Sequence, residues 1–274
     1  MSLAGKTLFI TGASRGIGLA IGLRAARDGA NVVVVAKTVE PHPKLPGTIH
    51  TAAAEIEAAG GTALAVQCDV RSEEEIARAV RAAAERFGGI DAVVNNASAI
   101  RLGGTADVDA KAFDLMTAIG PRATYLVTRA ALPYLEKSAN AHILTLSPPI
   151  ALASKWVGGA PAYTFKKYGM TLLTLAFAAE FRARGIAANA LWPKTTIATA
   201  AVRNLLGGEA MINASRTPEI VAEAAHAILD ADARRVTGNT FIDEDVLRER
   251  GETDFSRYAV APGTPLADDI FLDA

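Results

Sequence analysis

A short apolar strand that runs directly into a glycine-rich turn is the feature that most constrains the fold. Leu8-Phe9-Ile10 leads into Thr11-Gly12-Ala13-Ser14-Arg15-Gly16-Ile17-Gly18, and an alanine-rich helical pattern follows. Glycines permit a tight turn here and let the backbone approach a ligand, while the first turn of the next helix offers unpaired N–H groups and a partial positive charge. The arrangement predicts a phosphate-binding cradle, although three glycines after a strand also suit a simple tight turn.

Apolar runs of four to six residues alternate with helical patterns as far as about residue 242. This alternation predicts βαβ units in an α/β fold, with a doubly wound parallel sheet of about seven strands in a single domain. We expect strands at Thr7–Thr11, Asn31–Ala36, Thr62–Gln67, Asp91–Asn95, His142–Leu146, Ala187–Leu191 and Asn239–Ile242. We expect helices at Gly18–Asp28, Thr48–Ala59, Ser72–Phe87, Ala110–Glu136, Ala162–Ala183 and Pro218–Ala231.

The length of 274 residues fits one large domain. We assign residues 1–242 to the α/β domain and residues 243–274 to a C-terminal extension packed on it, because this tail mixes charged residues with prolines and an apolar Ile270-Phe271-Leu272. Three prolines between Pro41 and Pro46 predict an extended excursion after the second strand.

The overall charge excludes several classes of partner. Lys and Arg total 28 against 29 Asp and Glu, so a net charge of −1 provides no drive toward nucleic acid or an anionic membrane, and a small molecule is the expected partner. No run of 18 uncharged apolar residues predicts a membrane span. The single cysteine, Cys68, fits a reducing cytoplasm and is expected to be buried, and the four scattered histidines predict no metal site.

The end of the second strand bears on the choice of cofactor. NAD enzymes often place a carboxylate there, whereas this chain has Ala36-Lys37-Thr38. Lys37 and Arg15 are two cations that suit a 2′-phosphate, which favours NADP over NAD. The alternative is that both are ordinary solvated surface charges.

A tyrosine and a lysine share one face of a later helix. Tyr163 and Lys167 follow Pro161 at i, i+4 spacing. A nearby cation favours the phenolate and lowers the pKa of a tyrosine, so Tyr163 is a candidate acid–base group. In isolation such a pair is very common and is more typical of an ordinary helix surface.

Taken together, Thr11-Gly12-x-x-x-Gly16-x-Gly18, Asn95-Asn96-Ala97 and Tyr163-x-x-x-Lys167 resemble the motifs of the short-chain dehydrogenase/reductase family in order and spacing. The resemblance implies that Tyr163 donates a proton to a carbonyl and that Lys167 binds the nicotinamide ribose. For the cofactor it implies Gly12, Ser14, Arg15, Gly16, Ile17 and Gly18 on the pyrophosphate side, Lys37 at the 2′-phosphate, Asp69 and Val70 at the adenine, Asn96 and Ala97 at the ribose side, and Pro193, Ile197 and Thr199 over the nicotinamide and diphosphate.

Two positions depart from the family pattern. The serine that orients the substrate carbonyl usually lies about thirteen residues before the tyrosine, where this chain has Pro148, so Ser147 takes that role only if the following loop reshapes the strand end. The family's asparagine, which holds a water in the proton relay, corresponds to Gly120 here. Pro121 should also bend the helix at this point and expose a carbonyl.

These features predict an NADP-dependent oxidoreductase that interconverts an apolar ketone or aldehyde with an alcohol, with Tyr163, Lys167 and Ser147 as catalytic residues. The resemblance further implies a homodimer or homotetramer built through the helices expected at 110–136 and 162–183. The alternative, motivated by Gly120 and Pro148, is an NADP-binding sensor or scaffold with little catalysis.

Overall fold

A computed structural model describes residues 2–42 and 45–272 of the chain. Within these residues seven parallel strands form one sheet in the order β3-β2-β1-β4-β5-β6-β7. The strands are β1 (Thr7–Thr11), β2 (Asn31–Ala36), β3 (Thr62–Gln67), β4 (Ala92–Asn95), β5 (Ala141–Leu146), β6 (Ile186–Trp192) and β7 (Thr240–Ile242). The predicted doubly wound sheet is therefore confirmed, with strand boundaries that differ from the prediction by one residue at most.

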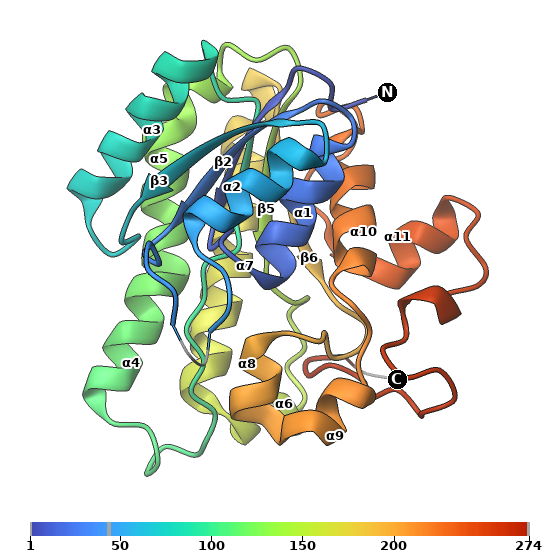
Figure 1. Cartoon of the computed structure of the whole chain (residues 1–274). Helices are drawn as coiled ribbons and strands as arrows, with labels where there is room; N and C mark the ends of the chain where they lie inside the picture. The colour runs from blue at the N-terminus through green and yellow to red at the C-terminus, as the bar shows by residue number, and fades with distance from the viewer. Residues whose placement is uncertain (1, 43–44, 273–274) are drawn as a thin grey trace.

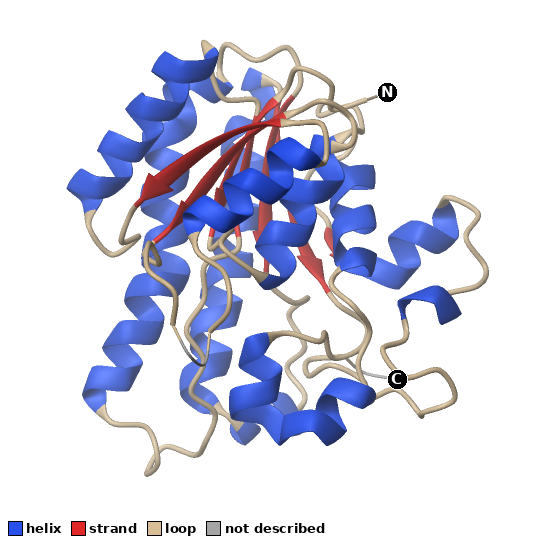
Figure 2. Cartoon of the chain, in the orientation of Figure 1, coloured by secondary structure: helices blue, strands red, loops and turns tan. Residues whose placement is uncertain are grey.

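Helices cover both faces of the sheet (Figures 1 and 2). The principal helices are α1 (Gly16–Ala26), α2 (Ile49–Ala58), α3 (Glu73–Phe87), α4 (Ala110–Thr117), α5 (Ala123–Leu135), α7 (Pro161–Phe181), α10 (Glu219–Leu229) and α11 (Asp243–Glu249). One core joins α1, α2, α10 and α11 to one face, and a second joins α3, α5 and α7 to the other. Along β2, Val32 and Val34 enter the first core and Val33 and Val35 the second, as expected for a strand buried on both sides.

The strand order reverses between β1 and β4, so the chain leaves the carboxyl ends of these two neighbours toward opposite halves of the sheet. Ligands of such sheets bind in the crevice outside this switch point. The glycine loop follows β1, and Asn96 follows β4, on the two sides of the reversal. Beyond the same edge lie α4, α8 (Ala200–Val202), α9 (Gly208–Asn213) and α6 (Ser154–Gly159) (Figure 1).

The helix predicted from Ala110 to Glu136 is not continuous. A π-helical segment, η1 (Ala118–Arg122), separates α4 from α5, and Gly120 within it has a non-helical ψ of −106°. Pro121 removes a backbone donor and disturbs the regular hydrogen bonding, which is the bend that its presence predicted.

Other segments have structure that their periodicity did not predict. The short elements α6, α8, η3 (Arg203–Gly207) and α9 are helical, and α11 opens the C-terminal extension. In the excursion after β2, Pro43 and Lys44 lie outside the described residues, while His42 and Leu45 pair across them in an isolated bridge. None of the described helices combines the length and apolarity that a membrane crossing requires.

Candidate functional site

The backbone of the glycine loop forms a tight turn that requires glycine at two positions. Gly12 and Gly16 have φ values of +68° and +58°, in the left-handed region that favours glycine. A side chain at Gly18 would place its Cβ 2.5 Å from Asn96 Nδ2 and 2.7 Å from the Gly12 oxygen. No side chain caps the start of α1, and its first turn holds no acidic residue. The loop therefore leaves the positive end of α1 accessible to an anion.

Asn96 ties the loop after β4 to the glycine loop. Its Nδ2 donates to the carbonyl oxygens of Thr11 at 2.9 Å and Gly12 at 3.1 Å. In return, Thr11 Oγ1 accepts hydrogen bonds from the backbone N–H groups of Asn96 and Ala97, both at 3.1 Å. These four hydrogen bonds fix the two loops against each other across the switch point.

Two of the predicted cofactor residues form an ion pair at the far end of the crevice. Lys37 Nζ lies 3.2 Å from Asp69 Oδ2, and the Arg71 guanidinium binds both oxygens of the same carboxylate. These cations hold the pKa of Asp69 well below its usual range. One carboxylate shared by two cations leaves this group with a net positive charge. The Lys37 side chain remains 59% exposed, so it is free to reorient toward a ligand.

Arg15 is held against the excursion that follows β2. Its Nε donates to the Pro46 oxygen at 2.8 Å and its Nη2 to the Gly47 oxygen at 2.6 Å. Gly47 is confined in turn, because a Cβ there would lie 2.6 Å from the Ser14 oxygen. The described partners of Arg15 are neutral carbonyls, so its positive charge is not cancelled.

Further predicted cofactor residues lie near the carboxyl ends of the strands. Thr199 Cγ2 would touch a Cβ at Gly16 at 3.4 Å, which places Thr199 directly beside the glycine loop. Pro193 follows the end of β6, and Ile197 is buried in the same core as α1. The remaining predicted residues, Ser14, Ile17 and Val70, are buried or partly buried near the ends of β1 and β3.

Tyr163 and Lys167 lie in the first two turns of α7, at the same edge of the sheet. Both are buried, with 5% and 4% of their surface exposed. Lys167 Nζ donates to the Leu146 oxygen at 2.6 Å and lies 4.7 Å from the centre of the Trp192 ring. This contact connects α7 to the end of β5.

The pKa of Tyr163 is shifted in the direction opposite to the one expected from a neighbouring ammonium group. Burial raises the pKa of the Tyr163 phenol, and the Asp269 carboxylate raises it further. Burial also lowers the pKa of Lys167 to about 8, opposed by Asp269. The spacing of Tyr163 and Lys167 predicts a neighbouring cation but gives no sign of the burial, which is the largest cause of the shift.

Ser147 is the first residue beyond β5 and is fully buried. Its Oγ is among the described buried polar atoms that have no hydrogen-bond partner. The next residue, Pro148, is fixed by its carbonyl oxygen, which accepts a 2.7 Å hydrogen bond from Thr171 Oγ1 of α7. Leaving a buried hydroxyl unpaired costs about 1–3 kcal/mol, a cost that a bound ligand with a suitable oxygen would relieve.

The C-terminal tail covers Tyr163. The sequence did not predict this contact. Phe271 stacks on the Tyr163 ring with 6.1 Å between centroids and a 17° angle between planes. It also contacts Trp156, Tyr168 and Trp192, with centroid separations of 6.0, 5.2 and 6.1 Å. We call these five residues the aromatic cluster. Phe271 has a φ of +72°, and no other non-glycine residue in the described chain has a positive φ. The apolar run 270–272 signalled packing, but not its partner.

Asp269 accompanies Phe271 into the site. Its backbone N–H donates to the Lys194 oxygen at 3.0 Å, and Trp192 Nε1 donates to the neighbouring Ile270 oxygen at 3.0 Å. Burial raises the pKa of Asp269 to about 7, while Lys167 opposes the shift. The tail thus places one carboxyl group, that of Asp269, where it interacts with both Tyr163 and Lys167.

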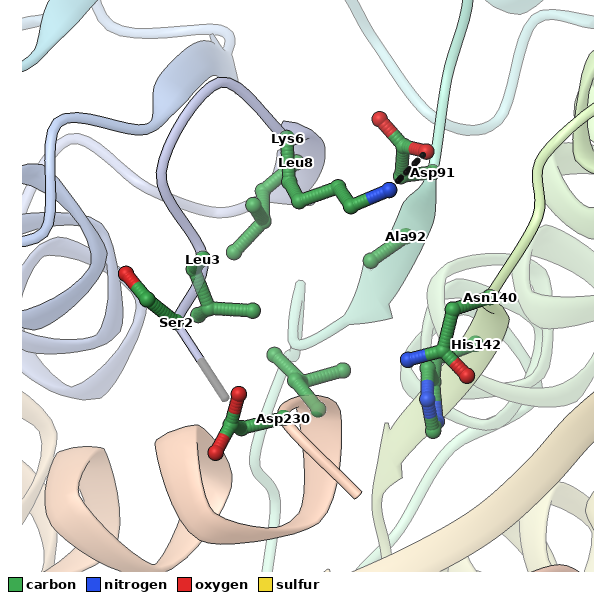
Figure 3. A pocket seen from close by; sticks show the side chains of 10 residues that line it. Ser2, Leu3, Lys6, Leu8, Asp91, Ala92, Asn140, His142 and Asp230 are labelled. Carbon is green, nitrogen blue, oxygen red and sulfur yellow. Dashed lines mark hydrogen bonds and ion pairs between the residues drawn. The ribbon is translucent and has the colours of Figure 1, made fainter. Parts of the chain in front are cut away.

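A cavity lies elsewhere, at the amino ends of the strands (Figure 3). It measures about 190 Å³ and lies among Lys6, Asp91 and His142. Lys6 pairs with Asp91 at 3.4 Å, and burial lowers the pKa of His142 to about 4. Because the glycine loop and Tyr163 are at the opposite edge of the sheet, this cavity is separate from the candidate site.

No group of three or more His, Cys, Asp or Glu residues in the described part of the chain is arranged to hold a metal ion. Cys68 is buried as predicted, and burial raises the pKa of its thiol to about 12.

Comparisons with known proteins agree with this geometry. A profile of the family described as short chain dehydrogenase matches residues 6–209. The chain is 57% identical to hydroxysteroid dehydrogenase-like protein 2 of Danio rerio over 271 residues, which are 99% of this chain and 65% of that protein. The chain therefore spans somewhat less than two thirds of the length of this relative.

Two solved structures extend the likeness over nearly all of both chains. One is a protein from Xanthomonas campestris assigned as a dehydrogenase, with 53% identity, a TM-score of 0.97 and full coverage of both chains. The other is a short chain dehydrogenase from Mycobacterium thermoresistibile, with 55% identity and a TM-score of 0.94, covering 100% of this chain and 97% of that one.

Proposed function

The chain belongs to the short-chain dehydrogenase family, and from that premise we propose that it is an NADP-dependent oxidoreductase that interconverts a carbonyl compound and an alcohol. The observation that carries the proposal is the placement of two features at one edge of the sheet. An uncapped helix start at the glycine loop suits a diphosphate, and buried Tyr163 with Lys167 suits proton transfer.

The residues present fit a dinucleotide. Gly12, Gly16 and Gly18 place no side chain at three positions of the glycine loop, and Asn96 fixes the loop from the other side of the switch point through hydrogen bonds to the Thr11 and Gly12 oxygens. The nicotinamide supplies or accepts the hydride when the cofactor is bound. Thr199, beside Gly16, lies where it would cover the diphosphate.

Tyr163 would move the proton. Its raised pKa keeps the phenol protonated at neutral pH, the form that reduction requires. As hydride reaches the carbonyl carbon, the Tyr163 Oη–H bond breaks and the proton goes to the carbonyl oxygen. In the reverse direction the phenolate takes that proton from the alcohol. Lys167 stabilises the phenolate left after transfer, and Ser147 Oγ would orient the substrate oxygen.

Charge at the far end of the crevice favours NADP. Arg15 retains its positive charge, and Lys37 with Arg71 exceeds the single negative charge of Asp69. A 2′-phosphate carries the opposite sign and suits this environment better than a ribose hydroxyl does. The aromatic cluster around Tyr163 in turn favours an apolar substrate.

The test measures oxidation of NADPH and NADH by the purified protein with ketones and aldehydes of graded chain length. We expect turnover with NADPH, and Tyr163→Phe should lower it by about a hundredfold to ten-thousandfold while NADPH affinity is retained. Tyr125→Phe is the matched control, because Tyr125 is 45% exposed on α5. Unchanged turnover in Tyr163→Phe would contradict the role of this residue.

One observation favours a second function, that of an NADP-binding sensor or scaffold. Phe271 covers Tyr163 and contributes to its burial, which opposes access of substrate to the phenol. Tight NADPH binding with no turnover of any carbonyl or alcohol, in the wild type and in Tyr163→Phe alike, would support this function instead.

An exposed apolar face supports assembly into a homodimer or homotetramer. Phe113, Phe165 and Leu172, on α4 and α7, are 37%, 57% and 58% exposed, and Phe113 stacks on Phe165 at 5.5 Å. Light scattering should show an oligomer that Phe165→Ser weakens, whereas a monomeric wild type would contradict this part of the proposal.

A further inference from the structure

Two consecutive lysines of α7 are buried and point to different strands. Lys167 reaches the end of β5 through the Leu146 oxygen. Lys166 is fully buried, and its Nζ donates to Ser98 Oγ at 2.5 Å and to the Ala99 oxygen at 2.9 Å, in the loop after β4. Burying an ammonium group is costly unless its donors are used, so these hydrogen bonds account for its position.

Lys166 also lies against the candidate acid–base residue. Its Nζ is 5.1 Å from the centre of the Tyr163 ring. The loop that it binds continues from Asn96 and Ala97, which hold the glycine loop. Lys166 is therefore a direct connection between the cofactor side of the crevice and the phenol.

The space that the Lys166 stem occupies exists because residue 120 has no side chain. A Cβ at Gly120 would lie 2.5 Å from Lys166 Cγ and 2.9 Å from its Cε. The π-helical segment brings this backbone against α7, and Pro121 packs beside Gly169, where a Cβ would be 3.2 Å away. Gly120 and Lys166 thus act as one packing unit.

We infer that Lys166 is a positioning residue of the proposed reaction: it holds the Ser98–Ala99 loop on α7 and favours the ionised form of Tyr163 from the space that Gly120 leaves. This inference rests on the proposed function. The charged groups that act on Tyr163 are Lys166 of α7, which lies over its ring, and Asp269 of the tail. Lys167 and Asp243 in turn interact with Asp269.

The charges around Tyr163 oppose one another. Asp269 disfavours the phenolate. An ammonium group at Lys166, whose Nζ lies 5.1 Å from the centre of the Tyr163 ring, favours it. Burial lowers the pKa of the Lys166 amine well below its ordinary value and the charge of Lys167 lowers it further, while the hydrogen bonds to Ser98 and Ala99 are the contacts that favour its protonated form. Removing Lys166 should therefore leave Asp269 with less opposition.

The first experiment compares pH profiles of kcat/KM for the wild type and Lys166→Met, which keeps the length of the side chain without its charge. We expect the limb that reports Tyr163 to move upward by about one pH unit, with kcat lowered about tenfold. If the limb stays in place and only thermal stability falls, Lys166 is structural and the inference is overturned.

The second experiment is a double-mutant cycle of Gly120→Ala and Lys166→Ala, read in NADPH affinity and in kcat. Gly120→Ala alone should lower both about tenfold, and adding Lys166→Ala should recover part of that loss because the clashing stem is gone. Gly89→Ala with Lys166→Ala is the matched control and should be additive, because a Cβ at Gly89 meets nothing within 4 Å. Additive effects in the Gly120 cycle would overturn the packing unit.

These outcomes are separable from failure of the proposed function. If Tyr163→Phe retains turnover, the acid–base role of Tyr163 fails, and the inference about Lys166 fails with it. If Tyr163→Phe is inactive but Lys166→Met keeps the wild-type profile, only the inference fails.

Discussion

The two ends of the candidate site are built in different ways. At the glycine-loop end, residues 11–18 are contiguous and contact a second short stretch, residues 95–97, through backbone groups and one amide side chain. At the tyrosine end, Tyr163 is surrounded by side chains from distant segments, including Phe271, which follows it by more than a hundred residues. Local spacing therefore determines the geometry of the first end, and tertiary packing determines the chemistry of the second.

This difference has electrical consequences. The glycine-loop end retains uncancelled positive charge at Arg15 and an uncapped helix start. The tyrosine end is desolvated, so the pKa of the phenol rises and the pKa of Lys167 falls to about 8. One end is suited to anion binding and the other to holding a proton until it is transferred.

The largest expected effect is a loss of stability on disrupting the tyrosine end of the site. Phe271→Ala removes a ring that is 2% exposed, and a cavity of this kind costs about 3–5 kcal/mol. Unfolding in urea should show this loss, together with a lower pKa of Tyr163 because water gains access. Phe271→Leu, which keeps most of the volume, should lose less. A loss below about 1 kcal/mol for Phe271→Ala would mean that the tail does not support the site.

A single added methyl group should disrupt the glycine-loop end of the site. Gly18→Ala places a Cβ against Asn96 Nδ2 and the Gly12 oxygen, so either the crevice widens or the Asn96 hydrogen bonds are lost. We expect NADPH affinity to fall about a hundredfold by fluorescence titration, with a smaller change in the pKa of Tyr163. Gly89→Ala is the control, because its Cβ meets nothing within 4 Å. Equal affinities in the two variants would contradict the close packing.

The buried Asp269 carboxyl at the tyrosine end should make the stability of the protein depend on pH. The folded-state pKa of about 7 exceeds the unfolded value of about 3.9, so the folded state binds more protons and stability falls as pH rises from about 4 to 7. Asp269→Asn should remove this loss, on the order of 4 kcal/mol at pH 8, in urea unfolding at graded pH. Asp268→Asn is the control. Parallel pH curves for wild type and Asp269→Asn would contradict the assignment.

The smallest effect is expected at the exposed charge of the cofactor end. Lys37→Ala should weaken NADPH binding several-fold and leave NADH binding unchanged, because Lys37 is exposed and shares Asp69 with Arg71. Raising the salt concentration should reduce the difference between wild type and variant. A parallel loss for both cofactors would show that Lys37 supports the loop rather than the 2′-phosphate.

The fold was predictable because its signals are local. Alternating apolar runs and turn residues located the seven strands, and Pro121 predicted the bend between α4 and α5. The short helices between Thr199 and Asn213 were not predicted, because these segments lack sustained periodicity and their structure depends on neighbours.

The sequence by itself determined the positions of the seven strands, the glycine loop and the i, i+4 spacing of Tyr163 and Lys167, because each depends on residues close together in the chain. Only the tertiary structure decided that Phe271 covers Tyr163, that burial rather than the ammonium group governs the pKa of the phenol, and that Lys166 fills the space beside Gly120. Desolvation and steric exclusion depend on every segment that meets at a point, and spacing along the chain does not specify which segments those are.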